Sequence, residues 1–327
     1  EGFHLVPVSK LLGLSSAAVM PPLPEQARLD TELAGAGFAI LTFTERLAVG
    51  LLALGLGLAL LRFVLVIVFA SLARRRPGPA ATAPPCASLA VVIPAWNESA
   101  VICQTVRSLL ASDAGPFPIL VVDDGSTDGT ADRVREGFGD EPRVRVIAQA
   151  NAGKWAALNR GFASVDADVV IAVDADTIFR PETVRLLAAH FEDPRVGAVA
   201  GNARVGNLRN LLTRFQALEY VTSQNLDRRA FAWLECITVV PGAVGAWRRE
   251  AVLGVQGYGD DTLAEDADLT LRLLRAGWRV RYEDRAIALT EAPETVGAFL
   301  RQRFRWTFGT LQAGWKHRKA AFRARPR

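Results

Sequence analysis

The sequence is poor in the residues on which thiol chemistry and imidazole chemistry depend. Its 327 residues include only three cysteines and three histidines. Cys86, Cys103 and Cys236 form no C-x-x-C pair, so neither a zinc site nor a disulfide framework is indicated. Three lone cysteines fit a reducing compartment. The histidines are equally scattered, which argues against a histidine-based metal site and against a Ser-His-Asp triad.

Two common nucleotide-binding motifs are also missing. No G-x-G-x-x-G follows the first predicted strand, which disfavours a dinucleotide-binding fold, and no G-x-x-x-x-G-K-[ST] is present, which excludes a P-loop NTPase. Residues 124–129 superficially resemble a calcium loop. A strand precedes them, however, and the twelfth position is Arg135 rather than Glu, so we discount that site.

The chain is rich in apolar residues, which make up half of its sequence. Residues 47–73 carry one charge, Arg62, and are long enough to cross a bilayer. Arg62 is costly in a membrane, so it faces a partner helix or the span is shifted. We predict a transmembrane helix and Arg triplet over 46–76 in a cell membrane, with residues 1–45 outside, a linker over 77–87 and a cytoplasmic remainder.

The C-terminal segment, 301–327, is basic. It contains nine Lys and Arg residues and no acid. Such a tail binds nucleic acid or anionic lipid. Because a membrane span lies elsewhere in the chain, we favour the lipid bilayer and expect no nucleic-acid partner.

From Ser88 onward, short apolar runs alternate with helical patterns. Strands are predicted at 89–93, 119–122, 144–147 and 169–173, with helices between them. This alternation predicts an α/β fold with a mostly parallel, doubly wound, Rossmann-like sheet. We assign 88–200 to a nucleotide-binding half and 201–300 to a catalytic half.

Polar side chains follow three of these strands. They are Asn97 and Glu98, Asp123 and Asp124, and Asp174 and Asp176. The carboxyl ends of parallel strands line one crevice, where open α/β folds bind ligands. Two acids one residue apart suit Mg²⁺ or Mn²⁺, which substrate phosphates usually complete. The sequence therefore predicts a site for a metal and a diphosphate.

Four segments in order resemble family 2 glycosyltransferases with the GT-A fold. They are Val-Val-Ile-Pro-Ala-Trp-Asn-Glu (91–98), Val-Val-Asp-Asp-Gly-Ser-Thr-Asp (121–128), Asn-Ala-Gly-Lys-Trp-Ala-Ala-Leu-Asn-Arg-Gly (151–161) and Asp-Ala-Asp (174–176). The resemblance implies that Asp123 or Asp124 contacts the uracil or ribose of a UDP-sugar, with Pro94, Asn97 and Glu98 nearby. It implies that Lys154 approaches the diphosphate, that Asp176 binds the metal and that Asp174 lies closer to the ribose or donor sugar. Helix capping is the ordinary alternative for Asn97 and Glu98.

The catalytic half contains a small-residue bend and an acidic helix start. Gly242 lies in the bend, where the family faces the acceptor sugar; a simple tight turn is the alternative. Glu265 and Asp266 open a predicted helix, and acids there also suit the helix dipole. The resemblance implies that Asp266 is the general base of a Thr-Glu-Asp motif, although Ala264 replaces the Thr.

Residues 302–306, Gln-Arg-Phe-Arg-Trp, match the Q-x-x-R-W motif of processive synthases. Arg305 can clamp a diphosphate, Trp306 can cover a sugar ring, and Gln302 and Arg303 offer hydrogen bonds. An amphipathic helix on the membrane surface is the other interpretation, and both can hold.

The resemblance points to an inverting, metal-dependent glycosyltransferase that extends a β-linked polysaccharide acceptor, with UDP-N-acetylglucosamine as the preferred donor. The pattern is most similar to poly-N-acetylglucosamine and chitin-oligosaccharide synthases. Two alternatives stay open: transfer of one sugar to a lipid, and a catalytically inactive nucleotide-binding scaffold. Residues 1–13 resemble the end of a polysaccharide deacetylase domain, which suggests a fused or associated deacetylase.

Overall fold

The computed structural model describes residues 6–75, 78–79 and 88–319. Most of the predicted linker, the last Arg of the triplet and the end of the basic tail therefore lie outside the described residues. The chain divides into two compact units, Glu1–Val64 and Leu65–Arg327, and each is described by itself.

The first unit consists of two short helices and most of a long one. Helices α1 (Val8–Leu11) and α2 (Ser16–Val19) precede α3 (Glu25–Ala73), which continues into the second unit. Helix α3 has 49 residues, and an exposed i,i+4 ion pair joins Arg28 and Glu32 near its start. It is the one helix in the described part of the chain that is long and apolar enough to cross a membrane.

Helix α3 begins well before the predicted limit of the span. At 1.5 Å per residue it is about 74 Å long, more than twice the roughly 30 Å of a bilayer core. A bilayer core could therefore accommodate only part of this helix. The sequence predicted the apolar part and missed the helical extension toward Glu25.

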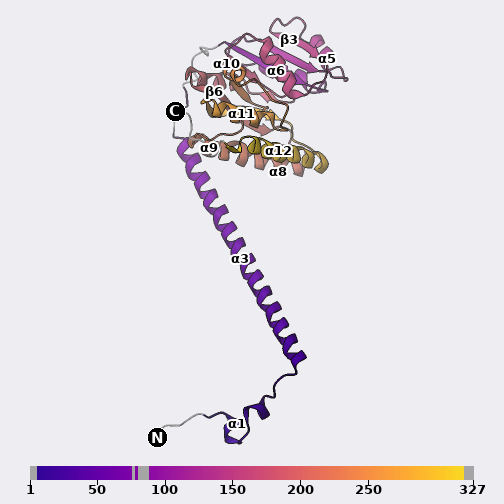
Figure 1. The fold of residues 1–327 in the computed structure, drawn as a ribbon. Coiled ribbons are helices and arrows are strands. Elements are labelled where there is room, and N and C mark those ends of the chain that lie inside the picture. Colours follow the sequence, from indigo (N-terminus) through magenta and orange to yellow (C-terminus); the bar gives the residue numbers. More distant parts are fainter. Residues whose placement is uncertain (1–5, 76–77, 80–87, 320–327) are drawn as a thin grey trace. The chain divides into compact units, whose positions relative to one another are not determined.

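The second unit is built on one eight-stranded sheet in the order β3-β2-β1-β4-β7-β6-β8-β5 (Figure 1). Its strands are β1 (Leu89–Ala95), β2 (Ile119–Asp124), β3 (Val144–Gln149), β4 (Val169–Ala172), β5 (Ile178–Phe179), β6 (Val196–Val205), β7 (Gly245–Arg248) and β8 (Arg279–Thr290). The pairs β1–β2, β2–β3, β1–β4 and β6–β8 are parallel, as predicted for the first half. Strand β7 is antiparallel to both of its neighbours, and β5 is antiparallel to β8.

Alternating side chains of the buried strands divide the core between the two faces of the sheet. Val91 and Ile93 pack with α4 (Ile102–Leu110), α5 (Thr130–Phe138) and α7 (Thr183–Ala188). Their neighbours in β1 face the other layer, which contains α6 (Lys154–Ser164), α10 (Arg249–Gly254) and α11 (Glu265–Arg275). Neither layer covers the carboxyl ends of the strands. A ligand site can therefore form there, as in other open α/β folds.

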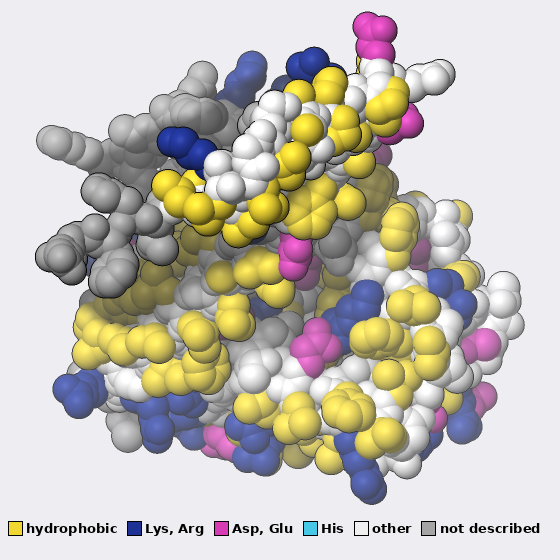
Figure 2. Space-filling view, turned by 90° about the horizontal axis from the view of Figure 1, so that it is seen from below, with side chains coloured by type: hydrophobic (Ala, Val, Ile, Leu, Met, Phe, Trp, Pro, Cys, Tyr) yellow, Lys and Arg dark blue, Asp and Glu magenta, His cyan; other side chains and the backbone are white. Residues whose placement is uncertain are grey.

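The sequence also predicts a helical stretch over 208–232, and the structure has three helical parts there: α8 (Leu211–Tyr220), a π-helix η2 (Val221–Asp227) and α9 (Arg228–Trp233). It packs beside the last helix, α12 (Val296–Lys316), where the rings of Tyr220 and Trp306 are 6.4 Å apart. The outer sides of both helices are apolar, with Leu211, Phe215 and Leu218 exposed on α8. Figure 2 views this face, where hydrophobic side chains gather beside Lys and Arg side chains.

Candidate active site

Two cavities meet at the carboxyl edge of the first strands. The sheet-edge cavity, of about 490 Å³, is lined by residues that include Pro94, Trp96, Glu98, Asp124, Lys154, Asp174, Asp176 and Arg305. The helix-side cavity, of about 440 Å³, is lined by residues that include Lys154, Asp174, Asp176, Tyr220, Gln224, Arg228, Gly242, Glu265, Asp266, Glu291, Gln302, Arg305 and Trp306. Lys154, Asp174, Asp176 and Arg305 line both. The two cavities therefore share one wall of charged side chains.

The two carboxylates at the end of β2 have different surroundings. The carboxylate of Asp124 accepts hydrogen bonds from the N–H groups of Ala152 (3.0 Å) and Gly153 (2.8 Å) and from the amide of Gln149 (2.7 Å). It thereby holds the loop that leads into α6. Oxygen Oδ1 of Asp123 is buried and has no hydrogen-bond partner among the described residues. Asp123 lines neither of the two site cavities, whereas Asp124 is hydrogen-bonded to the loop and also lines the sheet-edge cavity.

Asn97 and Glu98 follow β1 but have different roles. Asn97 has a positive φ of 57°, and its Oδ1 accepts a hydrogen bond from the N–H of Thr127 at 2.9 Å. It joins the loops after β1 and β2, so it neither caps a helix nor lines either of the two cavities. Glu98 does line the sheet-edge cavity. Burial, together with the charges of Asp176 and Asp174, raises the pKa of Glu98 to about 7.

Asp174 and Asp176 form the shared wall with Lys154. The Nζ of Lys154 lies 2.5 Å from Oδ1 of Asp174. Burial opposes the charge of this ammonium group, but Asp174 and Glu265 outweigh it and raise the pKa of Lys154. Burial and the neighbouring Asp174 raise the pKa of Asp176 to about 6. Among the described residues, Lys154 pairs with Asp174 and Glu265 and no ion pair involves Asp176, which leaves the carboxylate of Asp176 for a cation.

A divalent cation at this wall would need further ligand atoms from a bound substrate. No group of three or more His, Cys, Asp or Glu side chains in the described residues could hold a metal ion. Mg²⁺ and Mn²⁺ are hard ions that bind one or two carboxylates and fill their remaining positions with water and phosphate oxygens. Asp176 on a buried wall matches that pattern.

The bend around Gly242 brings the catalytic half onto this wall. A Cβ at Gly242 would lie 2.7 Å from Nζ of Lys154 and 3.2 Å from Asp174, so a side chain there would displace the ammonium group of Lys154. The hydroxyl of Thr270 accepts a hydrogen bond from the N–H of Val240 (3.1 Å) and donates one to the carbonyl of Asp266 (2.7 Å). The bend is thus fastened to the first turn of α11.

Asp266 lies at that first turn, facing the helix-side cavity. Its Oδ1 accepts a hydrogen bond from the N–H of Ala267 at 2.8 Å. Burial and the adjacent Glu265 raise the pKa of Asp266 to about 6. Glu265 lies 3.7 Å from Nζ of Lys154. A carboxylate with a raised pKa beside a cavity can accept a proton near neutral pH.

Helix α12 places the four predicted site residues of the Q-x-x-R-W segment differently. Gln302, Arg305 and Trp306 line the helix-side cavity. Arg303 lines neither of the two site cavities: it pairs with Glu219 on α8, and its guanidinium lies 4.6 Å from the ring centroid of Trp306. Arg303 therefore braces α12 against α8 in this structure, where the sequence predicted a substrate contact.

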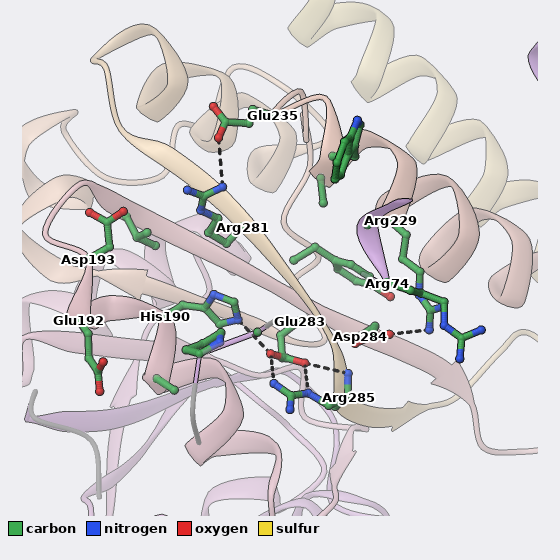
Figure 3. Close-up of a pocket in the computed structure, with 18 residues that line it drawn as sticks. Arg74, His190, Glu192, Asp193, Arg229, Glu235, Arg281, Glu283, Asp284 and Arg285 are labelled. Atoms are coloured by element: carbon green, nitrogen blue, oxygen red, sulfur yellow. Dashed lines mark hydrogen bonds and ion pairs between the residues drawn. The ribbon is translucent and has the colours of Figure 1, made fainter. Parts of the chain in front are cut away.

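A larger cavity of about 800 Å³ lies away from the strand ends (Figure 3). None of the predicted site residues lines it. Most of its charged side chains pair with one another: Arg281 with Glu235 (3.2 Å), Arg229 with Asp284 (2.5 Å), and Glu283 with both Arg285 (2.8 Å) and His190 (3.0 Å). Paired charges explain these residues without a ligand, so the site is at the strand ends.

The sequence model of the glycosyltransferase-like family 2 matches residues 84–309, which cover the whole sheet and every lining residue of the two site cavities except Thr310. The chain belongs to this family. Its GT-A-type sheet and its Q-x-x-R-W segment lie within the match, so the resemblance seen in the sequence is confirmed.

Curated relatives and a solved structure agree with this assignment. A poly-beta-1,6-N-acetyl-D-glucosamine synthase of Staphylococcus aureus (strain COL) is 31% identical over 215 residues, 65% of this chain and 52% of that protein. A probable glycosyltransferase, YdaM, of Bacillus subtilis (strain 168) is 35% identical over 232 residues, 68% of this chain and 54% of its own. The chain thus spans about half the length of the curated relatives that it matches.

The mannosyltransferase PcManGT from Pyrobaculum calidifontis, solved in complex with GDP-Man and Mn²⁺, has the same fold. It superimposes with a TM-score of 0.65 over 81% of this chain and 74% of its own, at 22% identity. At that identity the likeness concerns the fold alone.

Some residues of this family 2 site could not be found from the sequence. Gln224, Arg228 and Glu291 line the helix-side cavity but lie outside every motif. In the sequence, the pattern around Gln224 and Arg228 is typical of polar positions in an ordinary helix. The only available signal was the placement of an Arg among the apolar residues that end the stretch 208–232.

Proposed function

We propose that this chain is the catalytic part of a membrane-attached, inverting glycosyltransferase that uses a UDP-sugar, with UDP-N-acetylglucosamine as the preferred donor, to extend a β-linked polysaccharide. The observation that carries the proposal is the shared wall: Lys154, Asp174, Asp176 and Arg305 line both cavities at once. A donor in the sheet-edge cavity and an acceptor in the helix-side cavity would meet there. The name of the staphylococcal relative supports the choice of sugar.

On this proposal the nucleoside occupies the sheet-edge cavity, between Pro94 and Asp124 at the end of β2. Asp174 and Lys154 hold the ribose, sugar and diphosphate region. A divalent ion held by Asp176 and the diphosphate would neutralise the charge of the departing UDP. Arg305 adds a fixed positive charge on the side of the acceptor.

The acceptor sugar would lie in the helix-side cavity against Trp306 and near Gly242. Asp266 faces this cavity from the N-terminus of α11 and would take the proton of the attacking hydroxyl. Attack from this side, opposite to the departing diphosphate, inverts the anomeric carbon. Glu265 keeps Lys154 in place and holds the pKa of Asp266 up.

We propose further that α3 anchors the protein in a cell membrane, with the catalytic unit on the cytoplasmic side. The length and apolar composition of α3 support an anchor, and the arginines after its end support the cytoplasmic side. The exposed apolar residues of α8 and α12 suit a surface close to lipid. An associated deacetylase stays a prediction.

The proposed function is tested by UDP release from a panel of UDP-sugars and GDP-mannose, with mass analysis of the products of the full chain in detergent. We expect release from UDP-N-acetylglucosamine and products that differ by whole sugar units. One sugar on a lipid would support single transfer instead. Binding of UDP without turnover of any donor would support an inactive scaffold.

The rate of transfer should depend on pH through Asp266. Its raised pKa of about 6 means that the carboxyl takes up a proton as the pH falls through 6, and a protonated base cannot accept another. We expect kcat to be constant above that pH and to fall by about tenfold per pH unit well below it. The measurement uses saturating donor and metal, so that weaker donor binding does not contribute. A kcat unchanged down to pH 4.5 would contradict this role.

Close packing of α12 on the start of α11 gives a second prediction. A Cβ at Gly309 would lie 2.6 Å from the backbone N of Ala264 and 2.8 Å from the carbonyl carbon of Leu263. Gly309→Ala must therefore push α12 away from the segment that bears Asp266, and we expect transfer to fall by about 10- to 100-fold. Gly314→Ala is the matched control, because nothing lies within 4 Å of its Cβ. Equal rates for the two variants would show that this contact does not position the site.

A further inference from the structure

The wall of the helix-side cavity contains a stretch of π-helix. Helix η2 (Val221–Asp227) interrupts what would otherwise be one helix running from α8 into α9. The hydroxyl of Tyr282, on β8, donates a hydrogen bond to the carbonyl of Gln224 at 2.9 Å, which satisfies a carbonyl group of the widened turn. Single π-turns are rare and occur frequently at functional sites. Here the turn presents Gln224 and Arg228 to the cavity.

Arg228 is a buried cation with an unsatisfied donor. Its side chain is only 8% exposed, and its Nη1 has no hydrogen-bond partner in the described part of the chain. Burial lowers the pKa of this guanidinium, and the charge of Asp266 partly offsets that effect. Arg229, the next residue, is different, because it pairs with Asp284 at 2.5 Å in the larger cavity (Figure 3). A buried guanidinium with an unsatisfied donor is costly unless a ligand uses it.

Two amide oxygens, on different helices, lie in the helix-side cavity with Arg228. Oε1 of Gln224, on η2, and Oε1 of Gln302, on α12, are both buried without a hydrogen-bond partner among the described residues. Both side chains line the helix-side cavity with Arg228. The cavity thus offers one strong donor and two acceptors, beside the carboxylate of Asp266 and the ring of Trp306.

We propose that Gln224 and Arg228, together with Gln302, form a subsite that holds the acceptor sugar for attack. This inference rests on the proposed function and deepens it. A sugar ring carries hydroxyl or acetamido groups that both donate and accept, which matches an Arg donor flanked by two amide oxygens. The ring of Trp306 supplies an apolar face, as carbohydrate sites require. Neither Gln224 nor Arg228 lines the sheet-edge cavity, so the subsite serves the acceptor and not the nucleotide.

The test is the partition of the donor between transfer and hydrolysis in the full chain. UDP release measures all donor consumed, and free N-acetylglucosamine measures the part lost to water. For Arg228→Gln and for Gln224→Ala we expect the ratio of free sugar to transferred sugar to rise about tenfold or more, because a hydrogen bond to a charged group in a buried site contributes that much. The KM for the donor should stay within about twofold, since the donor lies in the other cavity.

Arg229→Gln is the matched control: the same change, one residue along α9, in a side chain that does not line the helix-side cavity. We expect it to keep the wild-type partition. If both subsite variants keep that partition while they bind UDP normally, the subsite is refuted and ordered water fills the cavity instead. If Arg228→Gln fails to bind UDP, the partition measured for Gln224→Ala alone tests the subsite. Failure of the wild type to consume any donor would refute the proposed function rather than this subsite.

Discussion

Asp266→Asn is expected to reduce sugar transfer by at least about 100-fold, and by up to about 10⁴-fold, while UDP binding is retained. The amide has nearly the same shape and can keep its hydrogen bond with the N–H of Ala267. It cannot accept a proton from the attacking hydroxyl. Because Asp266 lines only the helix-side cavity, the nucleotide loses no contact.

The raised pKa of Asp266 strengthens this expectation. Burial and Glu265 make the ionised form unfavourable, so proton uptake during attack relieves that cost. Asp260→Asn is the matched control, because Asp260 is an exposed acid in the loop before α11 and lines neither of the two site cavities. Rates are compared from single turnovers with saturating donor, and UDP affinity is measured by titration calorimetry. Near-normal turnover in Asp266→Asn would refute the general-base role, and Glu265 would be the next residue to test.

Asp176→Ala is expected to abolish the part of UDP binding that depends on a divalent ion, and transfer with it. In the wild type, Asp174 and Asp176 place two carboxylates on a buried wall where Lys154 bridges mainly to Asp174. The charge of Asp176 is therefore the one that is available to bind a cation. Without Asp176 the ion has only the diphosphate to hold it, and Asp174 stays paired with Lys154.

The measurement is calorimetric titration of UDP with and without Mn²⁺ or Mg²⁺. We expect the wild type to bind more tightly with metal and Asp176→Ala to bind equally weakly in both cases. Asp166→Ala is the control, since this exposed acid precedes β4 at the opposite end of the strand from Asp176. Circular dichroism checks that both variants are folded. An undiminished metal effect in Asp176→Ala would remove Asp176 from the metal site, and Glu98 would be the nearest carboxylate to test.

The parallel half of the sheet was readable from the sequence because its strands are short, mostly apolar runs, continuous in β1, β2 and β4 and interrupted only by Arg145 in β3. Strands β1 to β4 were predicted to within a few residues. Strands β7 and β8 were not predicted. Strand β7 is four residues long, and β8 mixes Arg, Glu and Asp with apolar positions, because only part of it is buried. Charged residues on a half-buried strand remove the pattern on which prediction depends.

The sequence by itself determined the fold class, the family and the order of the charged motifs, because strand ends in a parallel sheet must converge whatever the details of packing. It could not separate Asp123 from Asp124, or Arg303 from Arg305. Those distinctions depend on which oxygen or guanidinium finds a partner on another segment: the loop before α6 for Asp124, and Glu219 on α8 for Arg303.

Only the tertiary structure decided the composition of the helix-side cavity. Gln224 comes from the π-helix η2, Arg228 begins α9, and Gln302 comes from a helix some eighty residues further along the chain. Their importance lies in the absence of partners for buried polar atoms in the described residues. Burial and hydrogen bonding are properties of contacts between distant segments, so no local pattern records them.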